Sequence, residues 1–321
     1  MAYLLIVKVL ITGATGFVGS HLCEYLLRLG DEVHGTFIYQ HELDILPDLV
    51  RQHVVLHRCD LSAAEQIPEV LKIVQPERVY HLAAISSVHQ SWEGRDRVLR
   101  VNLFGWLHLL EALQQYCPET RVLMISSGEV YGKVPETQQP IREMQPLHPL
   151  NPYAASKAAQ ELLCYPYIHA YQLPIVIVRP FNHTGPRQVP NFVCPDLTKQ
   201  IAEIEKGLRE PVIAVGNLDV RRDFSDVRDV VRAYHLALEH GPVGAPVNVA
   251  SGKAWMIRDI LAILLQFSHV PIEIRPDPDR LRPSDVPLML GDFTRLKQQT
   301  GWQPEIPFEE TLLSALEYWR Q

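Results

Sequence analysis

Short apolar runs alternate with amphipathic stretches through the first half of the chain. The first run ends in "KVLITG", and a helical pattern follows it to Gly30. Further β-rich segments lie near 32–37, 53–58, 77–82, 120–126 and 174–178. Apolar strands that alternate with helices predict a parallel sheet with both faces covered, because each crossover helix packs on the sheet. We therefore expect an α/β protein with a doubly wound parallel sheet.

The alternation stops after Pro180. Loops rich in proline and asparagine follow ("RPFNHTGPRQVPNFVCP"), and then come a helix near 194–206 and a mixed region. This change predicts a smaller, mixed C-terminal lobe that closes over the carboxyl ends of the strands and binds the substrate. Segment 226–250 has the pattern of a helix followed by a strand, and we expect it to return to the first unit. The predicted units are 1–180 together with 226–250, and 181–225 together with 251–321.

Composition and charge narrow the class of protein. The 321 residues are 47% hydrophobic and 21% charged, as in a globular chain. The net charge of -7 includes no long run of either sign, so no nucleic-acid surface is indicated. The first apolar stretch contains Lys8 and is too short for a membrane span or a cleavable signal. The five cysteines form no CxxC pair, so we expect a cytoplasmic protein without disulfides or a metal.

A glycine-rich turn follows the first predicted strand. In "GATGFVG", Gly13, Gly16 and Gly19 lie where the strand turns into the first helix. Glycines there let the backbone approach a pyrophosphate, and the start of the helix stabilises its charge. The motif predicts a Rossmann-like dinucleotide site, and we place Phe17 and Val18 at the cofactor with the glycines. A purely structural glycine turn is the alternative.

Two other strand ends supply candidate cofactor contacts. Asp60 and Leu61 follow the third strand in "HRCDL", and an aspartate there could accept a hydrogen bond from the adenine amine. Ala83 lies in "HLAA" after the fourth strand, beside the expected path of the cofactor. At the end of the second strand an acid would favour NAD and an arginine NADP, but neither stands around Phe37 and Ile38. The sequence does not choose between NADH and NADPH.

The stretch "NPYAASKAA" puts Tyr153 and Lys157 four residues apart in a segment expected to be helical. Residues at this spacing share one helix face. A phenol has a pKa near 10, and a neighbouring ammonium favours its anion, so the pair is suited to acid-base chemistry. A surface tyrosine beside a solvated lysine is the alternative for this motif taken alone.

The glycine motif, "SSGEVYG" at 126–132 and the YxxxK motif, in this order, resemble the extended short-chain dehydrogenase/reductase family. The resemblance covers essentially the whole chain. It implies that Ser127, Tyr153 and Lys157 form the reactive set and that NADPH or NADH supplies a hydride. Tyr153 would exchange the proton, Ser127 would hydrogen-bond the reacting oxygen, and Lys157 would also bind the nicotinamide ribose. The resemblance further implies a homodimer through helices near 95–116 and 152–172.

Three downstream stretches resemble the GDP-4-keto-6-deoxy-mannose reductases. They are "RPFNHTGPRQ", "RRDFSDVRDVVRAY" and "RPSDVPLMLGDFTRLKQQTGW". The resemblance implies a GDP-linked keto-deoxy sugar as substrate and reduction of its C4 ketone to GDP-D-rhamnose. It places these residues at the sugar nucleotide: Ser86, Ser127, Glu129, Asn182, Arg222 and Arg282. An arginine can pair bidentately with phosphate oxygens, which suits a diphosphate in an otherwise acidic protein.

Glu129 is also consistent with a second activity, that of a sugar-nucleotide dehydratase. In sugar-nucleotide 4,6-dehydratases, a glutamate at this place in the motif removes the C5 proton. Gly128 stands where some of them carry an aspartic acid, although the GDP-mannose dehydratases do without it. Those enzymes usually have "GITGQDG" and "RDWG", whereas this chain has "GATGFVG" and "RDFSD", which favours a reductase.

Three further alternatives stay open from the sequence. An epimerase or a talose-forming reductase would use the same residues. A non-catalytic dinucleotide-binding regulator could share the fold, since fold does not determine function, but it would not need Ser127, Tyr153 and Lys157 together.

Overall fold

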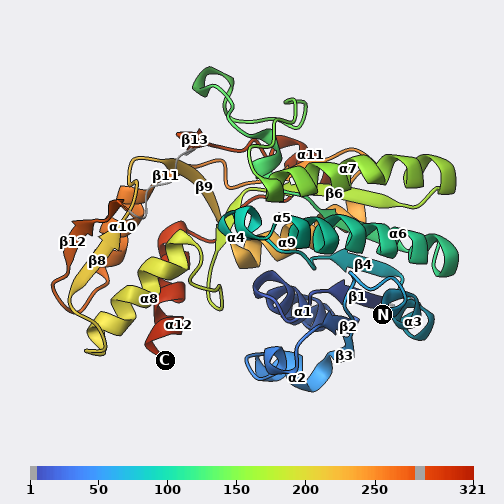
Figure 1. Cartoon of the computed structure of the whole chain (residues 1–321), viewed down its shortest axis with the longest axis horizontal. Helices are drawn as coiled ribbons and strands as arrows, with labels where there is room; N and C mark the ends of the chain where they lie inside the picture. The colour runs from blue at the N-terminus through green and yellow to red at the C-terminus, as the bar shows by residue number, and fades with distance from the viewer. Residues whose placement is uncertain (1–5, 279–285) are drawn as a thin grey trace.

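The computed structural model describes residues 6–278 and 286–321, and its main feature is a seven-stranded parallel sheet (Figure 1). The strand order is β10-β6-β5-β4-β1-β2-β3, and each neighbouring pair is parallel. The strands are β1 (Lys8–Thr12), β2 (Glu32–Phe37), β3 (Val55–Arg58), β4 (Arg78–His81), β5 (Arg121–Ile125), β6 (Ile175–Pro180) and β10 (Val247–Val249). The predicted doubly wound sheet is confirmed.

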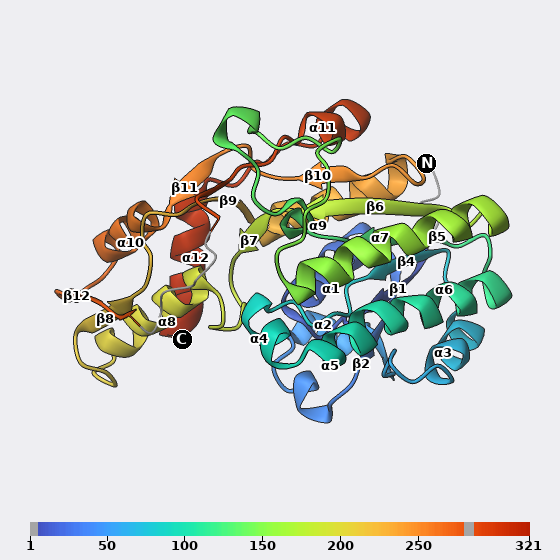
Figure 2. The ribbon, with the colours of Figure 1, turned by 45° about the horizontal axis from the view of Figure 1, so that its top comes forward.

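Helices cover both faces of this sheet. One face carries α1 (Phe17–Leu29), α2 (Asp48–His53), α9 (Val227–His240) and α11 (Thr294–Thr300). The other carries α3 (Gln66–Val74), α6 (Gly105–Tyr116) and α7 (Pro152–Tyr171), and the short helices α4 (Val88–Glu93) and α5 (Arg95–Val98) lie against α7. Short helical turns lie between these elements: η1 (Gln40–Leu43), η2 (Leu99–Phe104), η3 (Gly128–Tyr131) and η4 (Glu136–Gln138). Figure 2 shows α6 and α7 running side by side across their face.

Alternation along the strands divides the core in two. In β1, the side chains of Val9 and Ile11 pack with α1 and α9, whereas Leu10 packs with α3 and α6 on the opposite face. Successive side chains of a strand point to opposite faces, so an uninterrupted apolar run serves both cores at once. The continuous apolar runs in the sequence thus arise because each strand must supply side chains to both cores.

The remaining elements form a smaller mixed lobe, on the left of Figure 1. Its helices are α8 (Val193–Glu205), α10 (Ile257–Gln266) and α12 (Phe308–Arg320). Its strands are β7 (Asn182–Thr184), β8 (Val212–Val215), β9 (Arg221–Asp226), β11 (Ala254–Met256), β12 (Glu273–Pro276) and β13 (Leu288–Met289). A separate apolar cluster holds the three helices against β8 and β9.

Segment 227–249 lies with the first sheet. Val231 and Tyr234 of α9 are buried in the same cluster as β1, and β10 pairs in parallel with β6. The chain thus leaves the sheet after β6, forms part of the lobe, and comes back to add a strand at the sheet edge. The division into two ligand-binding units stays a prediction.

Three findings concern the other expectations drawn from composition. Within residues 6–278 and 286–321, no helix combines the length and apolarity needed to cross a membrane. All five cysteines are free and buried. In the same part of the chain, no group of three or more His, Cys, Asp or Glu side chains could hold a metal ion.

Candidate active site

The glycine-rich turn connects β1 to α1 and lies against the end of β4. Gly13 has a φ of +71°, and a Cβ there would come 3.0 Å from the backbone of Ala83. A Cβ on Gly19 would come 2.3 Å from the carbonyl oxygen of Gly13. Gly16 is the N-cap of α1 and supplies no side-chain cap for the first-turn amides. This close backbone packing at an uncapped helix start fits a dinucleotide pyrophosphate.

Phe17 and Val18 directly follow Gly16 and are the first two residues of α1. The Phe17 ring stacks on His183, with 6.1 Å between ring centroids, and Val18 packs against the apolar core of that face. A second contact joins α1 to the same loop, because Arg187 forms a 2.8 Å ion pair with Glu24. Helix α1 is thereby held to the loop that follows Asn182.

Asp60 and Leu61 lie just beyond the end of β3. Oδ1 of Asp60 accepts hydrogen bonds from the backbone N–H and the hydroxyl of Ser62, at 2.9 and 2.7 Å. Leu61 is buried close to Gly105 at the start of α6. The aspartate is therefore fixed locally through one oxygen. A role in binding adenine stays a prediction.

The end of β2 carries an acid that the sequence reasoning missed. After Phe37 the chain forms η1, and Oε2 of Glu42 accepts a 2.6 Å hydrogen bond from Thr15 Oγ1 and a 3.4 Å one from Ile38 N. Arg58, at the end of β3, donates from Nε to the Ile38 carbonyl at 3.3 Å. Glu42 stands four residues beyond the place where an acid was expected, and only the turn of η1 brings it back.

Tyr153 and Ser127 come together where β5 ends and α7 begins. Asn151 caps α7 by accepting a 2.8 Å hydrogen bond from Ala154 N, which sets Tyr153 in the first turn. Ser127 follows β5, where its hydroxyl accepts a 3.1 Å hydrogen bond from Glu129 N and lies close enough to the phenol of Tyr153 to lower the pKa of that phenol. The amide of Asn151 also donates to Glu129 Oε2 at 3.3 Å, which brings the Glu129 carboxylate to the same place.

The environment of Tyr153 differs from the expectation that its pKa is lowered. Burial raises the pKa of Tyr153 to about 12, the Ser127 hydroxyl lowers it, and the Glu129 carboxylate raises it further. The phenol is therefore protonated at neutral pH, which suits a proton donor. Burial outweighs the favourable contacts because the phenolate would lose its hydration.

Lys157 is buried one turn along the same helix. Its Nζ donates a 2.7 Å hydrogen bond to the carbonyl of Ile125, the last residue of β5. Burial lowers the pKa of Lys157 to about 7, and the carboxylate of Glu161 opposes that shift. The solvated lysine of the alternative interpretation is thus excluded, since only 3% of Lys157 is exposed.

A buried polar network lies behind the reactive set. Glu161 forms a 2.6 Å ion pair with Arg179 of β6 and accepts a hydrogen bond from the Ser126 hydroxyl. Arg179 also donates to the Tyr131 hydroxyl at 2.9 Å, and that hydroxyl donates to Asn248 of β10 at 2.7 Å. The spacing of Glu161 four residues after Lys157 is the signal that could have identified this network.

The residues predicted to bind the sugar nucleotide are spread over the two parts of the molecule. Ser86 is exposed in the loop after β4. Asn182 opens β7 and pairs with Phe224 of β9. Arg222 lies in β9, and its Nη1 donates to the carbonyl of Val286. Arg282 lies outside the described residues.

Comparison with known proteins identifies the family. A family model described as GDP-mannose 4,6 dehydratase matches residues 10–314. This chain belongs to that family. The family member is 38% identical over 312 residues to the GDP-6-deoxy-D-mannose reductase of Pseudomonas aeruginosa, with 97% of each chain covered. The predicted resemblance to the extended dehydrogenases/reductases, and to the 4-keto reductases among them, is confirmed.

Solved structures show the same architecture with bound dinucleotides. RMD from Pseudomonas aeruginosa, complexed with NADPH, is similar with a TM-score of 0.83 and 36% identity, over 98% of this chain and 99% of that one. The UDP-glucose 4-epimerase of Thermus thermophilus, in complex with NAD, is similar with a TM-score of 0.85 and 31% identity, over 97% and 98% of the two chains. Similar folds therefore bind either form of the cofactor.

Proposed function

We propose that this family member reduces the C4 ketone of GDP-4-keto-6-deoxy-D-mannose to GDP-D-rhamnose, with NADPH or NADH as hydride source. The observation that carries the proposal is the buried phenol of Tyr153, which holds its proton at neutral pH and has the Ser127 hydroxyl beside it. Ketone reduction consumes one proton along with the hydride, so a protonated donor is required. The likeness to the reductase over 97% of the chain supports the same choice.

The proposed chemistry assigns one task to each reactive side chain. When bound, the nicotinamide dinucleotide supplies the hydride. Ser127 donates a hydrogen bond to the ketone oxygen and holds it beside Tyr153. Tyr153 Oη gives its proton to that oxygen as negative charge develops on it. Lys157 places an ammonium one helical turn away, which stabilises the phenolate that Tyr153 becomes.

We infer that the first unit, 1–180 with 226–250, holds the dinucleotide. The turn of Gly13, Gly16 and Gly19 would approach the pyrophosphate, and Ala83 packs against that turn. Phe17, Val18, Asp60 and Leu61 complete the proposed cofactor set, and Lys157 would bind the nicotinamide ribose.

We infer that the lobe, 181–225 with 251–321, holds the sugar nucleotide. Asn182, Arg222 and Arg282 would contact its diphosphate side, while Ser86, Ser127 and Glu129 would contact the sugar from the first unit. Support for this division comes from β7 and β9, which are paired and carry Asn182 and Arg222 beyond the end of β6.

A second candidate, GDP-mannose 4,6-dehydratase, rests on Glu129. Its carboxylate is close enough to raise the pKa of Tyr153, and Asn151 orients it. A carboxylate there could remove a proton from the sugar. We prefer the reductase because the chain matches a named reductase over almost its full length.

Paired incubations test the two candidates. GDP-4-keto-6-deoxy-mannose is incubated with NADH or NADPH, and GDP-mannose with NAD+ or NADP+, and the products are identified by mass and NMR. We expect GDP-rhamnose in the first incubation only. Conversion of GDP-mannose to the keto sugar would make Glu129 the base and replace the proposed function, and no reaction in either incubation would reject both candidates.

We also propose a homodimer through α6 and α7. Several large apolar side chains on α7, and on the turn η2 that leads directly into α6, are exposed to solvent: Leu99, Phe104, Leu162, Tyr165 and Tyr171. Exposed apolar side chains gathered on neighbouring helices are typical of an interface between subunits.

A further inference from the structure

Glu42 closes the end of β2 beside the glycine-rich turn. Its Oε2 accepts the 2.6 Å hydrogen bond from Thr15, and Thr15 belongs to the turn that connects β1 to α1. The weaker bond from Ile38 N ties the same carboxylate to the residue that follows β2. A charged group thus bridges the ends of two neighbouring strands at the expected dinucleotide site.

This position matters because of how dinucleotides lie on such sheets. The pyrophosphate lies at the first turn, and the adenosine ribose lies at the end of the second strand. An acid there accepts hydrogen bonds from the ribose hydroxyls of NADH. The 2′-phosphate of NADPH would bring negative charge against the same carboxylate, and that repulsion disfavours binding.

Glu42 is held in place and keeps one acceptor available. The turn η1 fixes its backbone, and the Tyr39 and His41 rings stack at 5.6 Å on the same turn. Within residues 6–278 and 286–321, no side chain or amide donates to the second carboxylate oxygen, Oε1. The side chain is half-buried, so solvent screens its charge less than that of a fully exposed acid.

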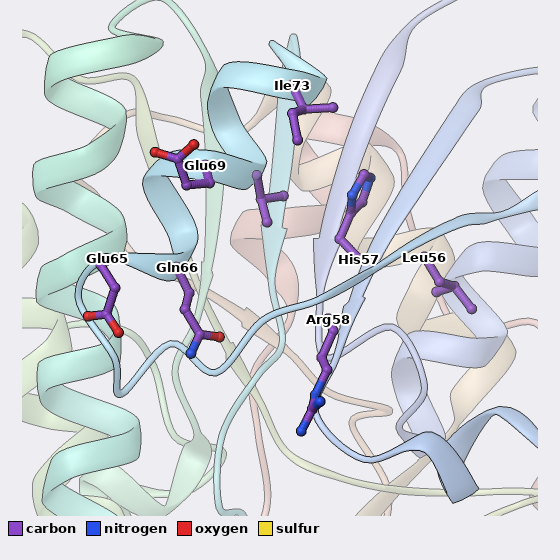
Figure 3. Close-up of a pocket in the computed structure, with 8 residues that line it drawn as sticks. Leu56, His57, Arg58, Glu65, Gln66, Glu69 and Ile73 are labelled. Carbon is purple, nitrogen blue, oxygen red and sulfur yellow. The ribbon is translucent and has the colours of Figure 1, made fainter.

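Arg58 is the side chain that could favour NADPH instead, because a guanidinium near Ile38 could bind the 2′-phosphate. Its Nε is already bonded to the Ile38 carbonyl. Arg58 also lines a hollow of about 580 Å³ between β3 and α3, and Glu65 and Glu69 line the same hollow from the helix side (Figure 3). Arg58 is therefore already engaged through its Nε, whereas Glu42 is the charged side chain that is bonded to the glycine-rich turn.

We propose that Glu42 determines cofactor specificity and makes this chain bind NADH more tightly than NADPH. The inference rests on the dinucleotide site of the proposed function and separates this chain from RMD of Pseudomonas aeruginosa, which is complexed with NADPH. The sequence alone indicated no preference, because the acid stands beyond the strand end.

The test is a binding titration of the full chain without any sugar nucleotide. NADH and NADPH are titrated by calorimetry into the unmodified protein and into Glu42→Gln, which can still accept the Thr15 hydrogen bond. We expect NADH to bind at least about tenfold more tightly to the unmodified protein, a difference of about 1.4 kcal/mol. In Glu42→Gln the ratio should fall at least about fivefold, because the like-charge repulsion of NADPH is removed.

Two control variants separate this effect from a general change of charge. Asp44→Asn removes one negative charge from the exposed residue that ends η1, without contact to Thr15, and should leave the ratio unchanged. Arg58→Ala should keep the preference for NADH. Thermal melting checks that each variant is folded.

Two results would overturn the inference. One is tighter binding of NADPH than NADH to the unmodified protein, and the other is an unchanged ratio in folded Glu42→Gln. Because no sugar is present, either result can occur while the reductase proposal still holds. Absence of binding by both dinucleotides would reject the two proposals together.

Discussion

The proton on Tyr153 is held by burial more than by its charged neighbours. Only 9% of this residue is exposed, and the loss of hydration raises the pKa of its phenol to about 12. For a reductase this direction is useful, because the donor must be protonated before the ketone oxygen becomes basic.

The first prediction concerns a substitution that removes the phenolic proton of Tyr153. Tyr153→Phe keeps the ring volume, so the fold and dinucleotide binding should be retained. Turnover with the keto sugar should fall by about 10²-fold to 10⁴-fold, the usual contribution of a general acid. The measurement is initial rate together with dinucleotide titration, and a variant that keeps half the normal rate would remove Tyr153 from catalysis.

The second prediction concerns pH and Lys157. Its pKa of about 7 means that the amine is charged below neutral pH and neutral above it. We expect dinucleotide affinity to fall as pH rises through about 7, because the ammonium that attracts the anionic cofactor is lost. The measurement is a series of dinucleotide titrations at pH values on both sides of 7. Lys157→Arg, which stays charged, should show a flatter profile, and affinity that rises with pH would contradict the assignment.

Three elements meet at the ion pair behind the site. Glu161 comes from α7, Arg179 from β6 and Ser126 from the end of β5. Both ionic side chains are at most 5% exposed, so each charge depends on the other for compensation.

The third prediction concerns a substitution that breaks the ion pair between Glu161 and Arg179. Arg179→Met leaves Glu161 buried without its cation and should lower the free energy of unfolding by about 3–5 kcal/mol, as measured in urea. Arg275→Met is the control, because Arg275 pairs with Glu273 at 3.1 Å and both side chains are largely exposed, away from the proposed dimer interface. That variant should unfold almost like the unmodified protein, and equal losses in the two would show that burial is not the cause.

The fourth prediction concerns the turn before α1. Gly13→Ala adds a methyl group against the backbone of Ala83 and should weaken dinucleotide binding at least about tenfold. Gly207→Ala has nearly the same φ, +69°, but nothing lies within 4 Å of the added Cβ. Both variants should lose about 1–2 kcal/mol of stability from backbone strain. Calorimetry should show weaker dinucleotide binding for the first variant alone.

Among whole-molecule properties, the proposed dimer is the most directly measurable. Leu162 of α7 is 64% exposed in the single chain, so Leu162→Glu should put a charge into the interface and yield a monomer. Light scattering measures the mass. Leu208→Glu, in the other lobe at 75% exposure, should leave the mass at that of two chains. A monomeric unmodified protein would reject the dimer.

The periodic parts of the molecule were predictable from the sequence, and the parts brought together by turns were not. Buried strands such as β1 and β6 are continuous apolar runs, and Asn151 and Pro152 mark the start of α7, so the sheet and the place of Tyr153 could be predicted. Glu42 could not, because η1 folds it back over Ile38. The raised pKa of Tyr153 could not be predicted either, since the spacing shows that a lysine is near but not how deeply the phenol is buried.

The return of 227–249 to the sheet has a consequence for biosynthesis. While the ribosome is still making the lobe, β6 is the last strand of an unfinished sheet, and its edge is free to pair with another chain. The apolar face that α9 covers is uncovered during the same interval. The N-terminal half therefore cannot finish folding as it emerges, and it depends on residues synthesised after the first part of the second lobe, 181–225. Truncation or a stalled ribosome before residue 249 would leave a chain prone to aggregation.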